Sequence, residues 1–146
     1  MIKMKIEESL KAIGGELVSG VGAKIFRGVS IDSRTLKKDE LFVCIRGDRF
    51  DGHDFIEEVQ NKKAAAIVLS DGSNVVSRRG EIPTIVRVDD TLKALQALAQ
   101  FHREKMPARV VGITGTNGKS TTKEMTAAIT EKKLKTIKTK GNLNNH

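Results

Sequence analysis

The chain has 146 residues, of which 38% are hydrophobic and 30% charged, so it can build one core and part of a second. No apolar run approaches the roughly 20 residues that span a bilayer, and the N-terminus lacks the apolar stretch of a secretory signal. We therefore expect a cytoplasmic protein without membrane insertion. The net charge of +8 would suit a nucleic-acid binder, but Trp and Tyr are absent, so we expect no nucleic-acid partner.

The first 88 residues predict a small mixed α/β domain. Residues 6–13 predict a short helix that ends at Gly14, because glycine readily adopts the left-handed conformation of a helix cap. Asp54 predicts the start of a second helix, whose apolar face includes Phe55 and Val59. Apolar and β-branched runs predict five strands, at residues 16–18, 24–29, 41–45, 65–69 and 83–88.

Residues 89–107 predict a helix that connects two domains. Asp89 or Asp90 caps it, and Met106-Pro107 ends it, because proline disfavours a helical conformation in the residue before it. Its apolar stripe follows helical spacing, and we interpret the histidine in that stripe as a packing residue rather than a catalyst. The stripe consists of Leu92, Leu95, Leu98 or Ala99, and His102.

Residues 108–146 predict the start of a parallel-sheet domain. A strand at 109–113, a helix at 121–131 and a strand at 135–139 make one βαβ unit. An open nucleotide-binding sheet has more strands than this unit supplies, and both of its faces are covered by helices. We therefore expect the chain to be the N-terminal part of a longer enzyme, and we expect this part alone to be inactive.

The turn between that strand and that helix has the composition of a phosphate-binding loop. Residues 112–122 read GITGTNGKSTT, although the common GxxxxGK[ST] pattern would have glycine at position 113. Glycines let successive backbone N–H groups point at a phosphate, and the helix N-terminus adds partial positive charge there. We expect ATP to be bound by Gly115, Thr116, Asn117, Gly118, Lys119, Ser120 and Thr121.

Two side chains of this loop have specific chemical roles in that prediction. Lys119 reaches the outer phosphates and offsets the negative charge that grows in phosphoryl transfer, so it is the candidate catalytic residue. The hydroxyl of Ser120 is the candidate ligand for Mg²⁺. A glycine turn that carries a lysine but binds no ligand is the plainer alternative, and the strand and helix on either side of the loop argue against it.

Three segments resemble the Mur ligase family. TGTNGKST at residues 114–121 resembles the ATP loop of that family. SIDSR at residues 30–34, with GDRFDGHDF at residues 47–55, is similar to the substrate domain of the muramyl-peptide ligases. GNLNN at residues 141–145 resembles the MurF branch of the family. Together the segments extend along nearly the whole chain.

The resemblance implies an ATP-dependent amide ligase of peptidoglycan precursor synthesis. Such an enzyme adds D-alanyl-D-alanine to UDP-MurNAc-tripeptide through an acyl phosphate, uses ATP and Mg²⁺, and acts as a monomer. The implied fold is a UDP-substrate domain at 1–88, followed after the connecting helix by the start of a P-loop parallel-sheet ATPase domain at 108–146. Two alternatives stay open: a MurE-type ligase that adds the third amino acid to UDP-MurNAc-dipeptide, and a non-catalytic module that binds a nucleotide or a UDP-sugar.

The resemblance also implies a set of substrate contacts. Ser33 and Arg34 would bind the uridine diphosphate, although Asp32 and Ser33 would also suit a simple turn. The substrate contacts that the resemblance implies are Ile31, Ser33, Arg34, Asp48, Arg49, Phe50, Asn142 and Asn145.

We interpret Asp51, His53 and Asp54 as a turn and a helix cap rather than a metal site, because residues so close in a turn rarely converge on one ion.

Overall fold

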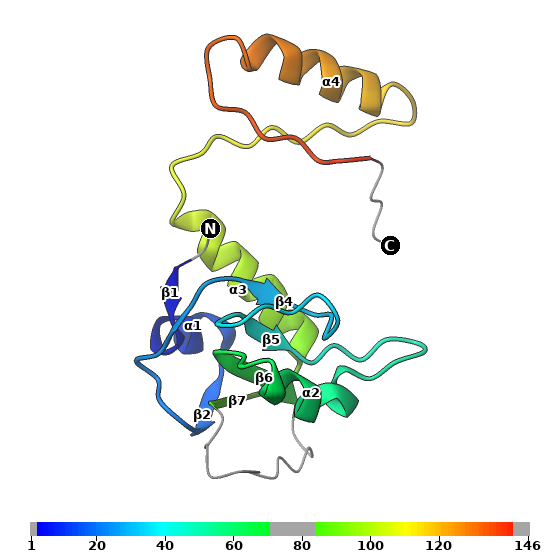
Figure 1. The fold of residues 1–146 in the computed structure, drawn as a ribbon. Helices are drawn as coiled ribbons and strands as arrows, with labels where there is room; N and C mark the ends of the chain where they lie inside the picture. The colour runs from blue at the N-terminus through cyan, green and yellow to red at the C-terminus, as the bar shows by residue number, and fades with distance from the viewer. Residues whose placement is uncertain (1–2, 71–83, 142–146) are drawn as a thin grey trace. The chain divides into compact units, whose positions relative to one another are not determined.

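The computed structural model describes residues 3–70 and 84–141 of the chain (Figure 1). It divides the chain into two compact units, Met1–Pro107 and Ala108–His146. None of the helices within the described ranges has the length and apolar character needed to cross a membrane.

The centre of the first unit is a five-stranded sheet with the strand order β2-β7-β6-β5-β4. Strands β4 to β7 pair in parallel, and β2 pairs antiparallel with β7 at the edge. Parallel strands are covered on both faces, which explains why β5 and most of β6 consist of buried apolar residues. The strands are β2 (Glu16–Ser19), β4 (Val29–Ser30), β5 (Leu41–Val43), β6 (Ala66–Ser70) and β7 (Ile85–Val88).

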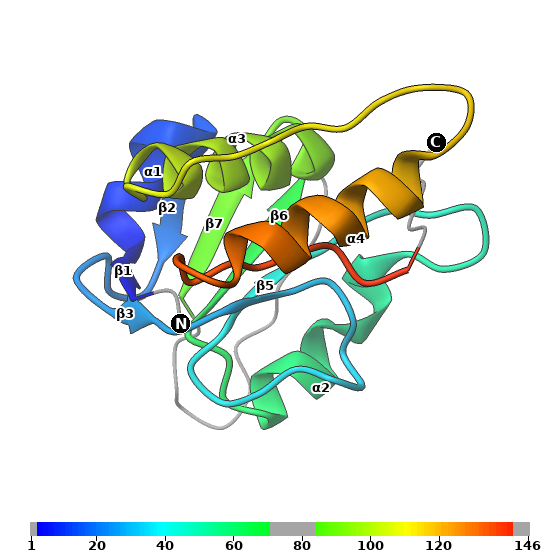
Figure 2. The same ribbon diagram turned by 90° about the horizontal axis from the view of Figure 1, so that it is seen from above.

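Helices cover the two faces of this sheet, as Figure 2 shows. On one face, α1 (Ile6–Ile13) and α3 (Thr91–Glu104) pack over Leu41, Val43 and other side chains of the same pleat. On the other face, the 3₁₀ turn η1 (Gly52–Phe55) leads into α2 (Ile56–Asn61), whose Val59 packs with Phe42 and Cys44. Successive side chains of a strand point to opposite faces, so one short strand supplies both cores. The predicted α/β fold class is confirmed.

Helix α3 belongs to the first compact unit, and whether it also connects two domains stays a prediction. The side chain of Asp90 caps it by accepting from the backbone N–H of Lys93, 2.9 Å away. Its buried residues are Thr91, Ala94 and Leu98. The first two lie one position before Leu92 and Leu95, which the sequence predicts for the apolar stripe in the N-terminal part of the helix. Leu92, assigned to that stripe, is exposed, because Ala94 and Leu98 pack into the core and position 92 then faces solvent.

Some boundaries in the first unit differ from the prediction. The strand expected at 24–29 forms two short strands, because β3 (Ile25–Phe26) pairs with β1 (Met4–Lys5) whereas β4 pairs with β5. Asp51 rather than Asp54 caps the turn before α2, since its side chain accepts from the backbone N–H of His53. Helix α1 has the predicted bounds and ends at Gly14 in the left-handed conformation.

The second unit contains the helix α4 (Lys119–Thr130) and extended segments on either side of it. The strands predicted at 109–113 and 135–139 are wrong for the part of this unit that the structure describes, where neither segment is assigned as a strand. An extended segment becomes a strand only when a neighbouring strand accepts and donates its hydrogen bonds, and these two do not pair with each other. Instead, the segment after α4 is tied to the helix by Lys123, whose ammonium donates to the carbonyl oxygen of Thr139 at 2.9 Å.

Candidate functional site

The glycine-rich loop of the second unit leads directly into α4. Gly115 and Gly118 have φ values of 145° and 77°, which favour glycine over any residue with a side chain. Gly118 is the N-cap, and its carbonyl oxygen accepts the first helical bond from the N–H of Thr122 at 2.9 Å. The N–H groups of the first turn have no carbonyl partner within the helix, and this is the property that makes a helix N-terminus bind anions.

The side chain of Lys119 folds back over this loop. Its ammonium donates to the carbonyl oxygens of Gly115 and of Thr116, the latter at 3.3 Å. These contacts hold a positive charge above the peptide groups that the sequence assigns to phosphate binding. An ammonium is a compact charge with three rotatable donors, so it can exchange a carbonyl for a phosphate oxygen with a small movement.

Ser120 and Thr121 occupy the first turn of α4 and are exposed, as are Thr116 and Asn117 in the loop. Mg²⁺ prefers oxygen ligands and usually keeps several waters while it binds one or two protein groups and substrate phosphates. A hydroxyl at position 120 fits that pattern. Within residues 3–70 and 84–141, no cluster of three His, Cys, Asp or Glu side chains offers a complete protein site for a metal.

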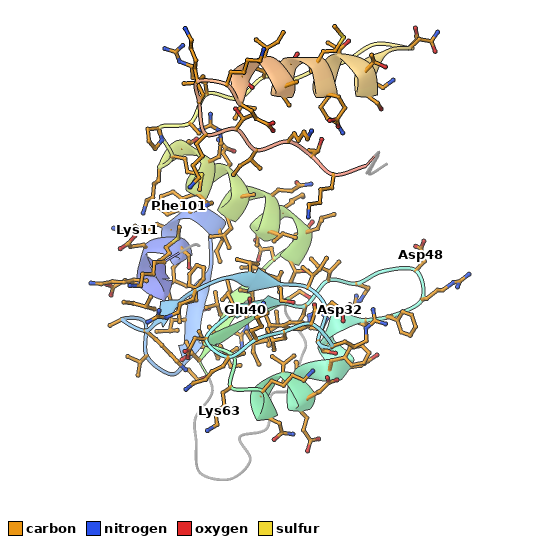
Figure 3. All side chains as sticks on the ribbon, turned by 45° about the horizontal axis from the view of Figure 1, so that its top comes forward. Lys11, Asp32, Glu40, Asp48, Lys63 and Phe101 are labelled. Atoms are coloured by element: carbon orange, nitrogen blue, oxygen red, sulfur yellow. The ribbon has the colours of Figure 1, made fainter. Side chains whose placement is uncertain are left out.

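The substrate residues predicted in the first unit lie at one edge of its sheet. The strands β4, β5 and β6 run parallel, so the segments after Ser30, Val43 and Ser70 all leave the sheet at its carboxyl edge. In open α/β sheets, ligands bind outside this edge. In Figure 3, Asp32 and Asp48 lie on the same side of the first unit, with Asp48 at the tip of the longer loop.

Ser33 is buried and its hydrogen-bonding groups face α2. Its hydroxyl donates to Oε2 of Glu58 at 3.0 Å, and its carbonyl oxygen accepts from the ammonium of Lys62 at 2.6 Å. Glu58 and Lys62 also form an ion pair at 2.9 Å. These contacts with Lys62, and then with Ser33, hold the pKa of the Glu58 carboxyl below its usual range. Ser33 thus anchors the loop after β4; that it also contacts the substrate stays a prediction.

Arg34 is highly exposed, with 85% of its side chain accessible. Its Nε and Nη2 donate to the two carboxylate oxygens of Asp32 at 2.9 and 2.7 Å. The side-chain contact with Arg34, followed by the backbone N–H of the same residue, lowers the pKa of Asp32 to about 2. Ile31 precedes this pair and is also exposed. The side chains of Ile31 and Arg34 are therefore open to a ligand.

The loop after β5 presents Asp48, Arg49 and Phe50 to solvent. Its base is closed by a bridge between Arg46 and Asp51 and by Nε of Arg46, which donates to Asp51 Oδ2 at 2.7 Å. Phe50 is 72% exposed, which is unusual for a phenyl ring. An exposed apolar ring in a closed loop suits stacking on a planar ligand group.

Sequence reasoning missed a network behind this loop. Asp51 Oδ1 contacts Nδ1 of the partly buried His53, while Nε2 of His53 accepts from the backbone N–H of Ser70 at 3.2 Å. Because Nε2 is an acceptor, the ring proton is on Nδ1, and this N–H donates a hydrogen bond to Asp51. The backbone N–H of His53, then its ring and Arg46, hold the pKa of Asp51 far below its usual range. The only sequence signal was the closeness of Asp51 and His53; nothing pointed to Ser70.

Asn142 and Asn145 lie outside the described residues, so their predicted roles stay predictions. The remaining predicted residues belong to two groups that the structure describes separately. One is the phosphate loop of the second unit, and the other is the pair of loops at the carboxyl edge of the first unit.

Comparison with known proteins gives consistent matches. Residues 25–139 match the Mur ligase family, catalytic domain. UDP-N-acetylmuramoyl-tripeptide–D-alanyl-D-alanine ligase from Bacillus subtilis (strain 168) is 40% identical over 100% of this chain and 32% of its own length. The crystal structure of MurF from Acinetobacter baumannii has a TM-score of 0.83 at 27% identity, over 99% of this chain and 31% of that one. MurF ligase from Thermotoga maritima in complex with ADP has a TM-score of 0.69 at 36% identity, over 81% of this chain and 26% of that one.

The sheet with helices on both faces defines an α/β protein, and the glycine loop at the start of α4 has the form of a phosphate-binding loop. The match over residues 25–139 defines it further: the chain belongs to the Mur ligase family. The family resemblance found in the sequence is thereby confirmed. The chain spans about a third of the length of the curated relatives it matches.

Proposed function

We propose that the protein is an ATP-dependent amide ligase of the MurF type. It joins D-alanyl-D-alanine to UDP-MurNAc-tripeptide in the synthesis of a peptidoglycan precursor. The observation that carries this proposal is the loop from Gly115 to Lys119, with its two positive φ values and its lysine, in a chain 40% identical to a ligase of that name. Both ATP and UDP-linked precursors are cytoplasmic metabolites, so we assign the protein to the cytoplasm; a monomeric state stays a prediction.

The reaction has two steps in this proposal. The terminal carboxylate of the tripeptide attacks the γ-phosphorus of ATP, the bond to the β-phosphate oxygen breaks, and ADP leaves. The amine of D-alanyl-D-alanine then attacks the carbonyl carbon of the acyl phosphate, an amide bond forms, and inorganic phosphate leaves with the bonding electron pair. The nitrogen loses one proton in this second step.

The residues of this chain contribute mainly to the first step. The N–H groups from Gly115 to Gly118 hold the phosphates, and the ammonium of Lys119 moves from the carbonyls of Gly115 and Thr116 to the outer phosphate oxygens. Once it has moved, the ammonium stabilises the negative charge that grows on these oxygens. A magnesium ion held partly by Ser120 would neutralise charge between the phosphates.

The first unit binds the other substrate in this proposal. Arg34 offers a cation for the diphosphate, and Ile31 and Phe50 offer exposed apolar surface for the uracil or the sugar. Asp48 and Arg49 lie beside Phe50 in the same loop, where they can accept from or donate to sugar hydroxyls. Separate sites for ATP and for the UDP substrate agree with the two compact units of the chain.

Phosphate release by the full-length enzyme tests this function. With UDP-MurNAc-tripeptide and ATP, we expect D-alanyl-D-alanine to stimulate release. A MurE-type ligase would instead use UDP-MurNAc-dipeptide with a free diamino acid, and a non-catalytic module would release no phosphate with any amine. Stimulation by the diamino acid alone would replace our proposal with the MurE alternative.

A further inference from the structure

A closed ring of hydrogen bonds joins the loop after β4 to α2. The hydroxyl of Ser33 donates to one carboxylate oxygen of Glu58, and the other carboxylate oxygen pairs with the ammonium of Lys62. The ring closes where Lys62 donates back to the carbonyl oxygen of Ser33 at 2.6 Å. This arrangement cannot be predicted from the local sequence, because the residues of the loop and of the helix are 25 or more positions apart in the chain.

The hydrogen-bond donors of the Lys62 and Ser33 side chains are used within this arrangement. A lysine ammonium has three N–H groups, and that of Lys62 contacts three acceptors: the carbonyl oxygens of Ser33 and Arg34, the latter at 3.5 Å, and the carboxylate of Glu58. Ser33 has one hydroxyl proton, which it gives to Glu58, and the residue is only 5% exposed. Neither side chain has a donor left for a ligand.

Arg34, in contrast to Ser33 and Lys62, has N–H groups that its neighbours do not use. Its guanidinium carries five N–H groups, of which those on Nε and Nη2 bind Asp32, and the side chain is 85% exposed. Its backbone is fixed on both sides: its N–H donates to Asp32 Oδ1 at 2.9 Å, and its carbonyl oxygen lies next to the ammonium of Lys62. Arg34 therefore keeps free donors on a backbone that its neighbours hold still.

We propose that Glu58 and Lys62 are positioning residues, which hold Arg34 where its guanidinium binds the diphosphate of the UDP substrate, and that Ser33 acts through the same ring rather than by touching the ligand. This inference rests on the proposed function, because it takes the UDP-sugar peptide as the ligand of this edge. It gives α2, to which the sequence assigned no role, a part in substrate affinity.

Calorimetric titration with UDP-MurNAc-tripeptide tests the ring. Lys62→Met removes the ammonium and keeps the length of the side chain, and we expect the affinity to fall about tenfold, the effect of losing about 1.4 kcal/mol. Lys62→Arg restores donors and should recover most of the loss. Lys63→Met is the matched control: it removes the same charge one residue later, from a side chain that lies away from Asp32 in Figure 3, and should bind like wild type.

A double variant separates positioning from direct contact. If Ser33 acts through the ring, Ser33→Ala combined with Lys62→Met should bind no more weakly than the worse of the two single variants. Additive losses would mean that the Ser33 hydroxyl touches the ligand itself, and an unchanged affinity of Lys62→Met would overturn the positioning role. Circular dichroism, measured in parallel, should show that every variant is folded at the temperature of the titration, so that a lower affinity does not reflect unfolding of the first unit.

The two proposals fail in different ways. If the wild-type protein does not bind UDP-MurNAc-tripeptide, the proposed function is wrong for the first unit. If the wild type binds and Lys62→Met binds equally well, the function stands and the positioning role of the ring is wrong.

Discussion

The backbone N–H of Ser70, at the end of β6, donates to Nε2 of His53 across a distance of 3.2 Å. The other nitrogen of the same ring faces Asp51, at the base of the loop that carries Phe50. One histidine thus links the end of a central strand to an exposed loop at the carboxyl edge of the sheet.

Replacement of His53 should destabilise the first unit. His53→Phe keeps a planar ring but leaves the N–H of Ser70 without this acceptor and removes one of the partners of the Asp51 carboxylate, so we expect a loss of about 1–3 kcal/mol in the free energy of unfolding. Urea unfolding followed by circular dichroism measures it. His102→Phe, at a half-buried position in α3, is the control and should change stability less. Equal losses in both variants would contradict a specific role for the network.

The ion pair between Asp32 and Arg34 predicts a pH effect. The pKa of Asp32 is about 2 in the folded protein, below its ordinary value of 3.8, so ionisation of this group favours the folded state above the ordinary value. This contribution is lost as the pH falls through about 2. Arg34→Gln should raise the pKa of Asp32, though not fully, because the backbone N–H of residue 34 still donates to it. Carboxyl-carbon chemical shifts measured against pH test this; an unchanged pKa would contradict the assigned cause.

The sequence predicted what depends on neighbours along the chain. The α1 helix with its Gly14 cap, the buried run of β6 and the glycine loop before α4 all rest on residues within a few positions of one another. What depends on distant partners was missed. The ring through Ser33 and the contact between His53 and Ser70 join residues that only the folded chain brings together.

The wrong strands have the same explanation. Residues 109–113 and 135–139 have the composition of strands, but strand formation requires a partner whose position the local sequence does not specify. The exposed Leu92 is a smaller case: helical spacing fits more than one choice of buried face, and the packing of Ala94 and Leu98 in the core selects between them.

Gly118 should be required for its backbone conformation rather than for space. A Cβ at this position meets no atom within 4 Å, but φ is 77°, where an L-residue costs about 1 kcal/mol or more. Gly118→Ala should therefore weaken ATP binding several-fold, as measured by calorimetry. Gly112→Ala is the matched control, because its Cβ also meets nothing within 4 Å and its φ is not positive. If both variants bind ATP alike, the positive φ at Gly118 is not required.

Lys119 should be required for chemistry more than for folding. Its ammonium contacts only carbonyl oxygens of its own loop in the contacts described, and the side chain is exposed, so Lys119→Ala should leave the melting temperature nearly unchanged. Removal of one preorganised donor to a developing negative charge lowers turnover by about 100-fold or more, and we expect at least that loss in phosphate release. Lys135→Ala, an exposed lysine beyond α4, removes the same charge and should keep wild-type turnover. A Lys119→Ala protein with near wild-type turnover would show that another group stabilises the transferred phosphoryl.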